Sequence, residues 1–172
     1  LHEGAPYLHD GFAQTLAEVF LFTGGEVIEA ESGTVSGAVV ANESVVTDYY
    51  KNTSFGSVVV MEAPGDQVTW NGLDGGPGGL GALNFRLHAE ADTLLTAIVN
   101  GTPHTLQVTA DRAAHDWRHF LVENIILTPG ATNTLVLESN GSTQVGIDQF
   151  TLSTATHLEK ARPHRVVQDL SP

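Results

Sequence analysis

The sequence contains no cysteine, few basic residues and no long hydrophobic run. The absence of cysteine excludes disulfides, thiolate zinc sites and covalently attached c-type haem. Seven Lys and Arg stand against twenty Asp and Glu, which gives a formal net charge of -13 over 172 residues. Because nucleic acids and anionic lipids are bound by clustered Lys and Arg, neither a nucleic acid nor a membrane surface is an expected partner. No apolar run approaches the ~20 residues of a membrane-spanning helix.

The residues that are abundant favour a β protein that can bind hard cations. Eighteen glycines occur together with many Thr, Ser, Asn and Val, which is typical of short strands and tight turns. Carboxylate and carbonyl oxygens are the ligands of Ca²⁺, so the excess of acidic residues suits such an ion. The length is that of one ordinary domain with a substantial core.

The first segment, residues 1–25, is the only one with a helical pattern. Thr15-Leu16-Ala17-Glu18 forms a capping box, Val19 and Phe20 follow it, and Gly24-Gly25 ends the pattern. A helix this short has no core of its own, so it must dock on something. The last segment, residues 155–172, has no apolar periodicity and is expected to be a linker or tail.

The middle segment, residues 26–154, alternates strand-like runs with turn signals. The runs are residues 58–60, 83–88, 94–99, 106–109, 120–127, 134–137 and 146–152. The turn signals are Pro64-Gly65-Asp66, Asn71-Gly72, Asn100-Gly101, Pro129-Gly130 and Asn140-Gly141. Together they predict an all-β fold, an antiparallel β-sandwich of the jelly-roll kind. The glycine-rich residues 72–81 are expected to form a long flexible loop, since the Gly-Lys-Ser/Thr ending of a phosphate-binding loop is missing.

Five short motifs appear in one order along the middle segment. They are Glu29-Ala30-Glu31, Val99-Asn100-Gly101, Asp116-Trp117, residues 127–135 (LTPGATNTL) and Ile147-Asp148. In this order they resemble the carbohydrate-binding modules of families 6 and 35. The resemblance implies a β-sandwich that binds sugar and carries a structural calcium ion.

A second resemblance concerns the first segment. Residues 5–11 (APYLHDG) and 15–20 (TLAEVF) look like the C-terminal tail of di-haem cytochrome c peroxidase-like oxidoreductases. The haem-attaching Cys-x-x-Cys-His motif is absent, so no electron transfer is assigned to the chain. This resemblance implies that residues 1–25 are the tail of an upstream domain.

Three carboxylates form the candidate metal site. Glu29 and Glu31 are predicted to alternate along one strand and so to share a face, with Asp148 of the last strand beside them. Neighbouring carboxylates repel each other unless a cation intervenes, and Ca²⁺ takes six to eight oxygen ligands. The family resemblance implies that backbone carbonyls around Lys51 and Asn52 complete the shell. The alternative is that Glu29 and Glu31 face solvent and Asp148 caps a turn.

Aromatic side chains are the candidate sugar platforms, because indole and phenol rings stack on the C–H faces of pyranoses. Trp117 lies where the family's cleft aromatic falls, and Tyr49 and Tyr50 lie in a loop that often supplies a facing ring. Trp70, within an apolar run, is expected in the core instead.

The polar side chains that would bind a sugar depart from the family pattern at one position. Where the family often carries an Asn before the closing Ile-Asp, this chain has Gly146; Gln144 and Asn140 are the candidates to replace that amide. Arg118 is a candidate for pairing with a uronate carboxylate.

These features predict a non-catalytic carbohydrate-binding module, a monomeric part of a larger chain that is secreted, periplasmic or on the cell surface and binds a polysaccharide or oligosaccharide. No enzyme motif such as Gly-x-Ser-x-Gly, His-Glu-x-x-His or a P-loop is present, and calcium accounts for the best acidic cluster. The alternative is a structural sandwich, or one that docks on a haem oxidoreductase domain, with no sugar site. Whether Trp117 and Tyr49 or Tyr50 line an open groove distinguishes the two.

Overall fold

A computed structural model describes residues 25–42, 53–54, 56–110, 117–154 and 156. Eleven strands and one 3-10 helix occur in this part of the chain. The elements are β1 (Glu26–Glu29), η1 (Ala30–Ser32), β2 (Thr34–Ser36), β3 (Val39–Asn42), β4 (Ser57–Met61), β5 (Gln67–Asp74), β6 (Gly79–Ala89), β7 (Thr93–Val99), β8 (Thr102–Val108), β9 (Arg118–Leu127), β10 (Ala131–Ser139) and β11 (Val145–Ser153).

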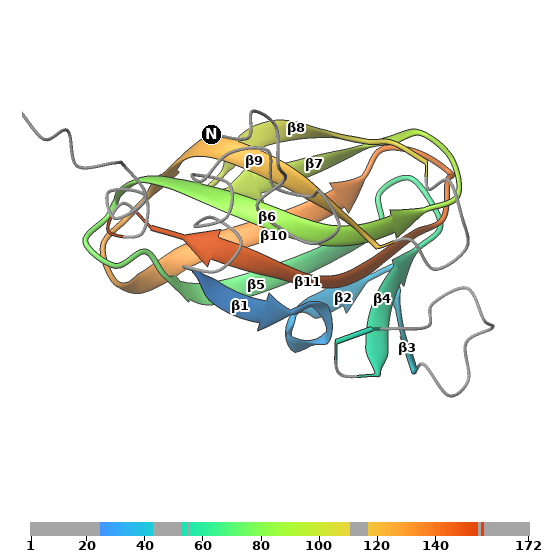
Figure 1. The fold of residues 1–172 in the computed structure, drawn as a ribbon, viewed down its shortest axis with the longest axis horizontal. Coiled ribbons are helices and arrows are strands. Elements are labelled where there is room, and N and C mark those ends of the chain that lie inside the picture. Colours follow the sequence, from blue (N-terminus) through green and yellow to red (C-terminus); the bar gives the residue numbers. More distant parts are fainter. Residues whose placement is uncertain (1–24, 43–52, 55, 111–116, 155, 157–172) are drawn as a thin grey trace, which may run out of the picture.

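The strands form two antiparallel sheets that face each other (Figure 1). The six-stranded sheet, called sheet A, has the order β3-β4-β11-β6-β9, with β1 also paired to β11. The five-stranded sheet, called sheet B, has the order β2-β5-β10-β7-β8. The antiparallel β-sandwich predicted from the turn spacing is therefore confirmed. The expected N-terminal helix and C-terminal tail lie outside the described residues.

Strand β11 changes partner halfway along one edge. Its first half pairs with β4 at residues 145–147, and its second half pairs with β1 at residues 149–152. The register against β6 shifts between Ile147 and Gln149, which places Asp148 at a β-bulge. Asp148 therefore lies where β4 gives way to β1.

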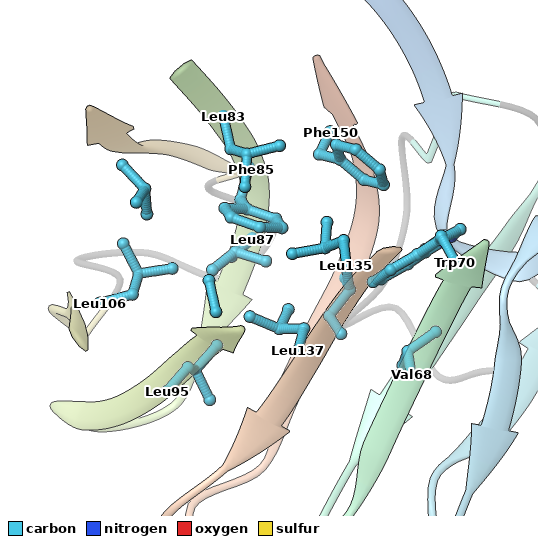
Figure 2. Packing of buried hydrophobic residues seen from close by; sticks show 14 of the residues in the cluster. Val68, Trp70, Leu83, Phe85, Leu87, Leu95, Leu106, Leu135, Leu137 and Phe150 are labelled. Atoms are coloured by element: carbon cyan, nitrogen blue, oxygen red, sulfur yellow. The ribbon is translucent and has the colours of Figure 1, made fainter. Parts of the chain in front are cut away.

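The core fills the space between the sheets. Alternate residues of β6 and β11, such as Phe85 and Phe150, point toward Leu135 and Leu137 of β10 (Figure 2). Trp70 of β5 is buried there as predicted and contacts Phe150 edge-to-face at 4.9 Å between ring centroids. At about 25 cal/mol per Å² of apolar surface, this interleaving of two faces is the main stabilising term of such a sandwich.

The loop within the glycine-rich stretch is shorter than predicted. Strand β5 runs through Gly72 to Asp74, and β6 begins at Gly79. Gly72 has a φ of +73°, and β10 is irregular opposite it, between Asn133 and Thr134. The Asn71-Gly72 pair, predicted as a turn, therefore marks an irregularity within a strand. No helix among the described residues is long and apolar enough to cross a membrane.

Candidate functional site

Glu29 and Asp148 share one hydrogen-bond donor at the junction of β1, β4 and β11. The Ser54 hydroxyl donates to Glu29 Oε2 at 2.6 Å and to Asp148 Oδ1 at 3.1 Å. The Ser54 backbone N–H donates to the same Asp148 oxygen at 2.7 Å. The chain just before β4 thus ties the end of β1 to the bulge of β11.

Arg86 neutralises the other oxygen of Asp148. Its guanidinium forms an ion pair with Asp148 Oδ2, and the Asp148 side chain is fully buried. A buried carboxylate is stable when it is paired and hydrogen-bonded, and Asp148 is both. Arg86 projects from β6 on the outer side of sheet A, opposite the core residues Phe85 and Leu87.

Glu31 does not continue the strand of Glu29, which corrects the prediction of two alternating strand positions. Strand β1 ends at Glu29 because a 3-10 turn follows. The Ser32 hydroxyl donates to the Glu29 carbonyl at 2.7 Å, and the Gly33 N–H donates to the Ala30 carbonyl at 3.1 Å. Glu31 therefore leaves β1 within this turn.

Glu31 nevertheless remains close to the other carboxylates. Burial raises the pKa of Glu29, and the charges of Asp148 and Glu31 raise it further, against the lowering effects of Ser54 and Arg86. Glu31 Oε2 is buried and has no hydrogen-bond partner among the described residues. A buried carboxylate oxygen without a partner is costly, and a cation would relieve that cost.

The donor chemistry of this cluster fits calcium, although the described side chains do not already form a cage. Within the described ranges, no three acidic, His or Cys side chains converge closely enough to hold a metal ion. The oxygens of Glu29, Glu31 and Asp148 are the hard ligands that Ca²⁺ takes, and a carboxylate oxygen can accept more than one contact. Lys51 and Asn52, expected to add carbonyl oxygens, lie outside the described residues.

Trp117 lies on the outer side of sheet A and is buried, with 5% of its surface exposed. It clusters with Val58 and Val60 of β4, apart from the main core. The Arg86 guanidinium lies 5.1 Å from the indole centroid, and the His88 ring lies 5.8 Å from it. The Arg86 geometry is that of a cation–π contact.

Gly146 gives Trp117 room to lie across the sheet. In the pairing register, Gly146 of β11 lies between Val60 of β4 and His88 of β6. Trp117 contacts side chains on both of those flanking strands, so its ring spans β11 where no side chain projects. The residue that differs from the family pattern is thus the one that accommodates the indole.

The other predicted sugar contacts have separate partners. Arg118 donates to Thr109 Oγ1 at 2.7 Å and to the Ala110 carbonyl at 3.2 Å. Asn140 Nδ2 donates to Thr96 Oγ1 at 2.8 Å, and Gln144 Nε2 donates to Glu62 Oε1 at 3.0 Å. None of these contacts joins the three residues to Trp117. Tyr49 and Tyr50 lie outside the described residues.

Sequence reasoning missed Ser54, Arg86 and His88. The run Leu83-Asn84-Phe85-Arg86-Leu87-His88 alternates apolar and polar residues, which is the pattern of a strand with one polar face. That signal identifies Arg86 and His88 as outward-facing. It cannot identify Asp148 and Trp117 as their partners, because that needs the order of strands in the sheet.

A hollow of about 260 Å³ lies at the end of the sandwich where β5 and β11 finish. It is lined by Glu26, Asp74, Gly76, Pro77, Leu152, Thr154 and Thr156. None of the predicted sugar or metal residues that the structure describes lines it.

No protein-family model and no curated protein matches this sequence. Solved structures match it through their fold. A family 35 carbohydrate-binding module (CBM35) from Paenibacillus barcinonensis has a TM-score of 0.66 and 23% identity, with 76% of this chain and 100% of that chain covered. A family 6 module from Clostridium stercorarium, in complex with cellobiose, has a TM-score of 0.59 and 19% identity, with 76% and 95% covered.

The same fold also occurs within a larger protein. A cycloisomaltooligosaccharide glucanotransferase from a Paenibacillus species matches with a TM-score of 0.63 and 23% identity, and the match covers 74% of this chain but only 18% of that one. About three quarters of this chain therefore has the fold of the carbohydrate-binding modules of families 6 and 35.

Proposed function

We propose that this chain is a non-catalytic carbohydrate-binding module that attaches a larger secreted protein to a polysaccharide. The observation that carries the proposal is the similarity in fold, which covers the whole length of a family 35 module. Tethering of this kind raises the local concentration of a substrate without any chemistry in the module itself.

The outer side of sheet A supports the proposal with a suitable group of side chains. An indole, a guanidinium and an imidazole lie together there, outside the main core. Aromatic faces bind sugar rings, and cationic groups bind sugar hydroxyls or uronate carboxylates. Trp117 is the platform in this proposal, with Tyr49 or Tyr50 as the facing ring.

Calcium has a structural role in the proposal. Glu29, Glu31 and Asp148 would hold the ion, with carbonyls near Lys51 and Asn52. Bound calcium supplies positive charge that offsets the repulsion between the carboxylates. The residues of the chain itself fix the position of this cluster, because Ser54 links Glu29 to Asp148.

A second function, a structural or interdomain-docking sandwich without a sugar site, is favoured by one observation. Trp117 is 5% exposed, whereas a stacking platform needs an open face. In this alternative the indole only seals the outer side of sheet A against Val58 and Val60.

The experiment that separates the two functions is binding of the full chain to a panel of neutral and uronic-acid polysaccharides. We expect binding that Trp117→Ala reduces at least about tenfold, the effect of losing roughly 1.4 kcal/mol of stacking. Leu94→Ala is the matched control, because Leu94 is an exposed apolar residue on the outer side of sheet B.

Because Trp117 is packed, each variant is first compared with the parent by thermal unfolding. Trp117→Phe keeps a ring against Val58 and Val60 and tests stacking if the Ala variant unfolds. No binding to any polysaccharide by folded, calcium-loaded protein would favour the structural function.

A further inference from the structure

The outer side of sheet A has a transverse row of four residues that point away from the core. Leu121 of β9 pairs with Asn84 of β6, Asn84 pairs with Thr151 of β11, and Thr151 pairs with Val27 of β1. Their neighbours in sequence, such as Phe85 and Phe150, fill the core, so these four face outward. We call the surface around this row the outer patch; it also includes Leu80 and Ile126, which pair with each other farther along β6 and β9.

The outer patch has a buried centre and an exposed apolar rim. Asn84 and Thr151, in the middle, are 4% and 6% exposed. Leu121, Val27 and Ile126, around them, are 38%, 53% and 63% exposed. Outward-facing residues in the middle of a sheet become buried when something covers that sheet. An exposed apolar rim around them marks an interaction surface.

Asn84 indicates what kind of group covers the patch. Its Oδ1 is buried and has no hydrogen-bond partner among the described residues. Buried side-chain oxygens are satisfied in most proteins, so the covering group must bring a hydrogen-bond donor as well as apolar side chains. A polypeptide segment, with its backbone N–H groups, meets both needs.

The chain itself arrives at this patch just before β1. A Cβ at Gly25 would lie 2.5 Å from Thr151 Cγ2 and 2.5 Å from the Leu152 carbonyl oxygen. Only glycine allows the backbone so close to the outer side of β11. Residue 24 and those before it are therefore connected directly to the edge of the outer patch.

We propose that residues 1–24 dock on the outer patch and form part of the sandwich domain. This segment supplies the apolar side chains Leu16, Val19, Phe20 and Phe22 within ten residues of Gly25. The residues after Thr156 fit the patch poorly, because Lys160, Arg162 and Arg165 interrupt them and they have no apolar periodicity. In this proposal the sandwich domain begins before residue 25.

The distances across the sheet suit this docking. Thr151 and Leu121 are two strand spacings apart, or about 10 Å. The five Cα–Cα steps from Phe20 to Gly25 span at most about 17 Å. Phe20 can therefore reach Leu121 while the backbone passes over Asn84.

Disulfide trapping tests the proposal cleanly, since the chain has no cysteine of its own. Leu121→Cys is combined in turn with Leu16→Cys, Val19→Cys and Phe20→Cys in the full chain. Asp74→Cys replaces Leu121→Cys in the matched controls, because Asp74 is exposed and lines a hollow together with Glu26, within reach of the first segment but off the outer patch. We expect at least one Leu121 pair to form an intramolecular disulfide about ten times faster than its Asp74 counterpart, as docking raises the effective concentration of the thiols.

Equal rates for the Leu121 and Asp74 pairs would overturn the proposal, because an undocked segment reaches both positions. Disulfide dimers of the single variant Leu121→Cys, formed faster than those of Leu94→Cys, would also overturn it and assign the patch to a second copy. As an independent measurement, Leu121→Asp should lower the melting temperature far more than Leu94→Asp. Similar melting temperatures for the two Asp variants would contradict docking on this patch.

Discussion

Asn133 joins three turns at one end of the sandwich through a side chain that is almost wholly buried. Its Nδ2 donates to the carbonyls of Leu73, Thr128 and Gly130 at 3.0, 2.9 and 3.2 Å. Its Oδ1 accepts the Thr128 N–H at 2.7 Å and Asn100 Nδ2 at 2.8 Å. This asparagine belongs to the motif LTPGATNTL, so one role of that motif is to close turns.

Asn133→Ala should destabilise the fold by about 3 kcal/mol, because it leaves several buried backbone groups without partners. Asn133→Asp should also be costly, since an oxygen would then face three carbonyls. Urea unfolding measures both. Asn140→Ala is the control, because Asn140 is exposed and makes a single side-chain bond to Thr96; a loss as large as that of Asn133→Ala would contradict this account.

Without a cation, the charged form of Glu29 is disfavoured in the folded state. Its pKa lies above the ordinary value of 4.5, first because of burial and then because of Asp148 and Glu31. An acid with a raised folded-state pKa favours folding when protonated. Its ionisation therefore removes stability as the pH rises through the raised pKa, and the cost is absent well below 4.5.

Glu29→Gln should raise the melting temperature in EDTA at neutral pH, because the amide removes the repulsion while still accepting from Ser54. The same variant should lose the increase in melting temperature that Ca²⁺ gives the parent chain. At pH values well below 4.5 the EDTA advantage of the variant should disappear. A variant that is destabilised in EDTA would contradict the repulsion at Glu29. A variant that still responds fully to Ca²⁺ would count against Glu29 as a ligand.

At the scale of elements, two turns meet at one carboxylate. Asp66 Oδ2 accepts the N–H groups of Glu62 and Ala63 at 2.8 and 2.9 Å, which closes the turn between β4 and β5. Gly37, between β2 and β3, passes so close that a Cβ there would lie 2.2 Å from Asp66 Oδ1. Its φ of +77° also favours glycine.

Gly37→Ala should cost about 2–3 kcal/mol, since left-handed backbone strain adds to the collision with Asp66. Gly65→Ala is the matched control: its φ is +87°, but nothing lies within 4 Å of its added Cβ. It should cost only about 1 kcal/mol, the strain alone. Equal losses in chemical denaturation would show that contact with Asp66 is unimportant.

The strands could be predicted from the sequence because alternation and turn residues are local signals. The runs around Val59, Leu95 and Phe150 all became strands, and Trp70 became a core residue. The break after Glu29 could not be predicted, because the 3-10 turn depends on the Ser32 hydroxyl in a sequence that otherwise suits a strand. The site was predicted only in part, since Arg86 meets Asp148 and Trp117 through sheet order and not through sequence spacing.

The whole molecule carries a formal charge of -13, and like charges destabilise a compact state. With calcium removed by EDTA, the melting temperature should rise as NaCl is added from about 0.01 to 0.3 M, over which the screening length falls below about 10 Å. Glu29→Gln should show the same salt response, because general screening does not depend on that one carboxylate. A melting temperature that is flat or falls over this range would indicate that the charges are already compensated within the fold.

The pairing of the first strand with the last has a mechanical consequence. Glu26 lies opposite Leu152, so tension applied through the residues before β1 and after β11 acts on two neighbouring points. Such a pull opens the β1–β11 hydrogen bonds one pair at a time, which needs less force than shearing them together. The four residues of β1 would peel away first and carry Glu29 from Ser54 and Asp148. Stretching would therefore dismantle the acidic cluster before it opens the rest of the main core.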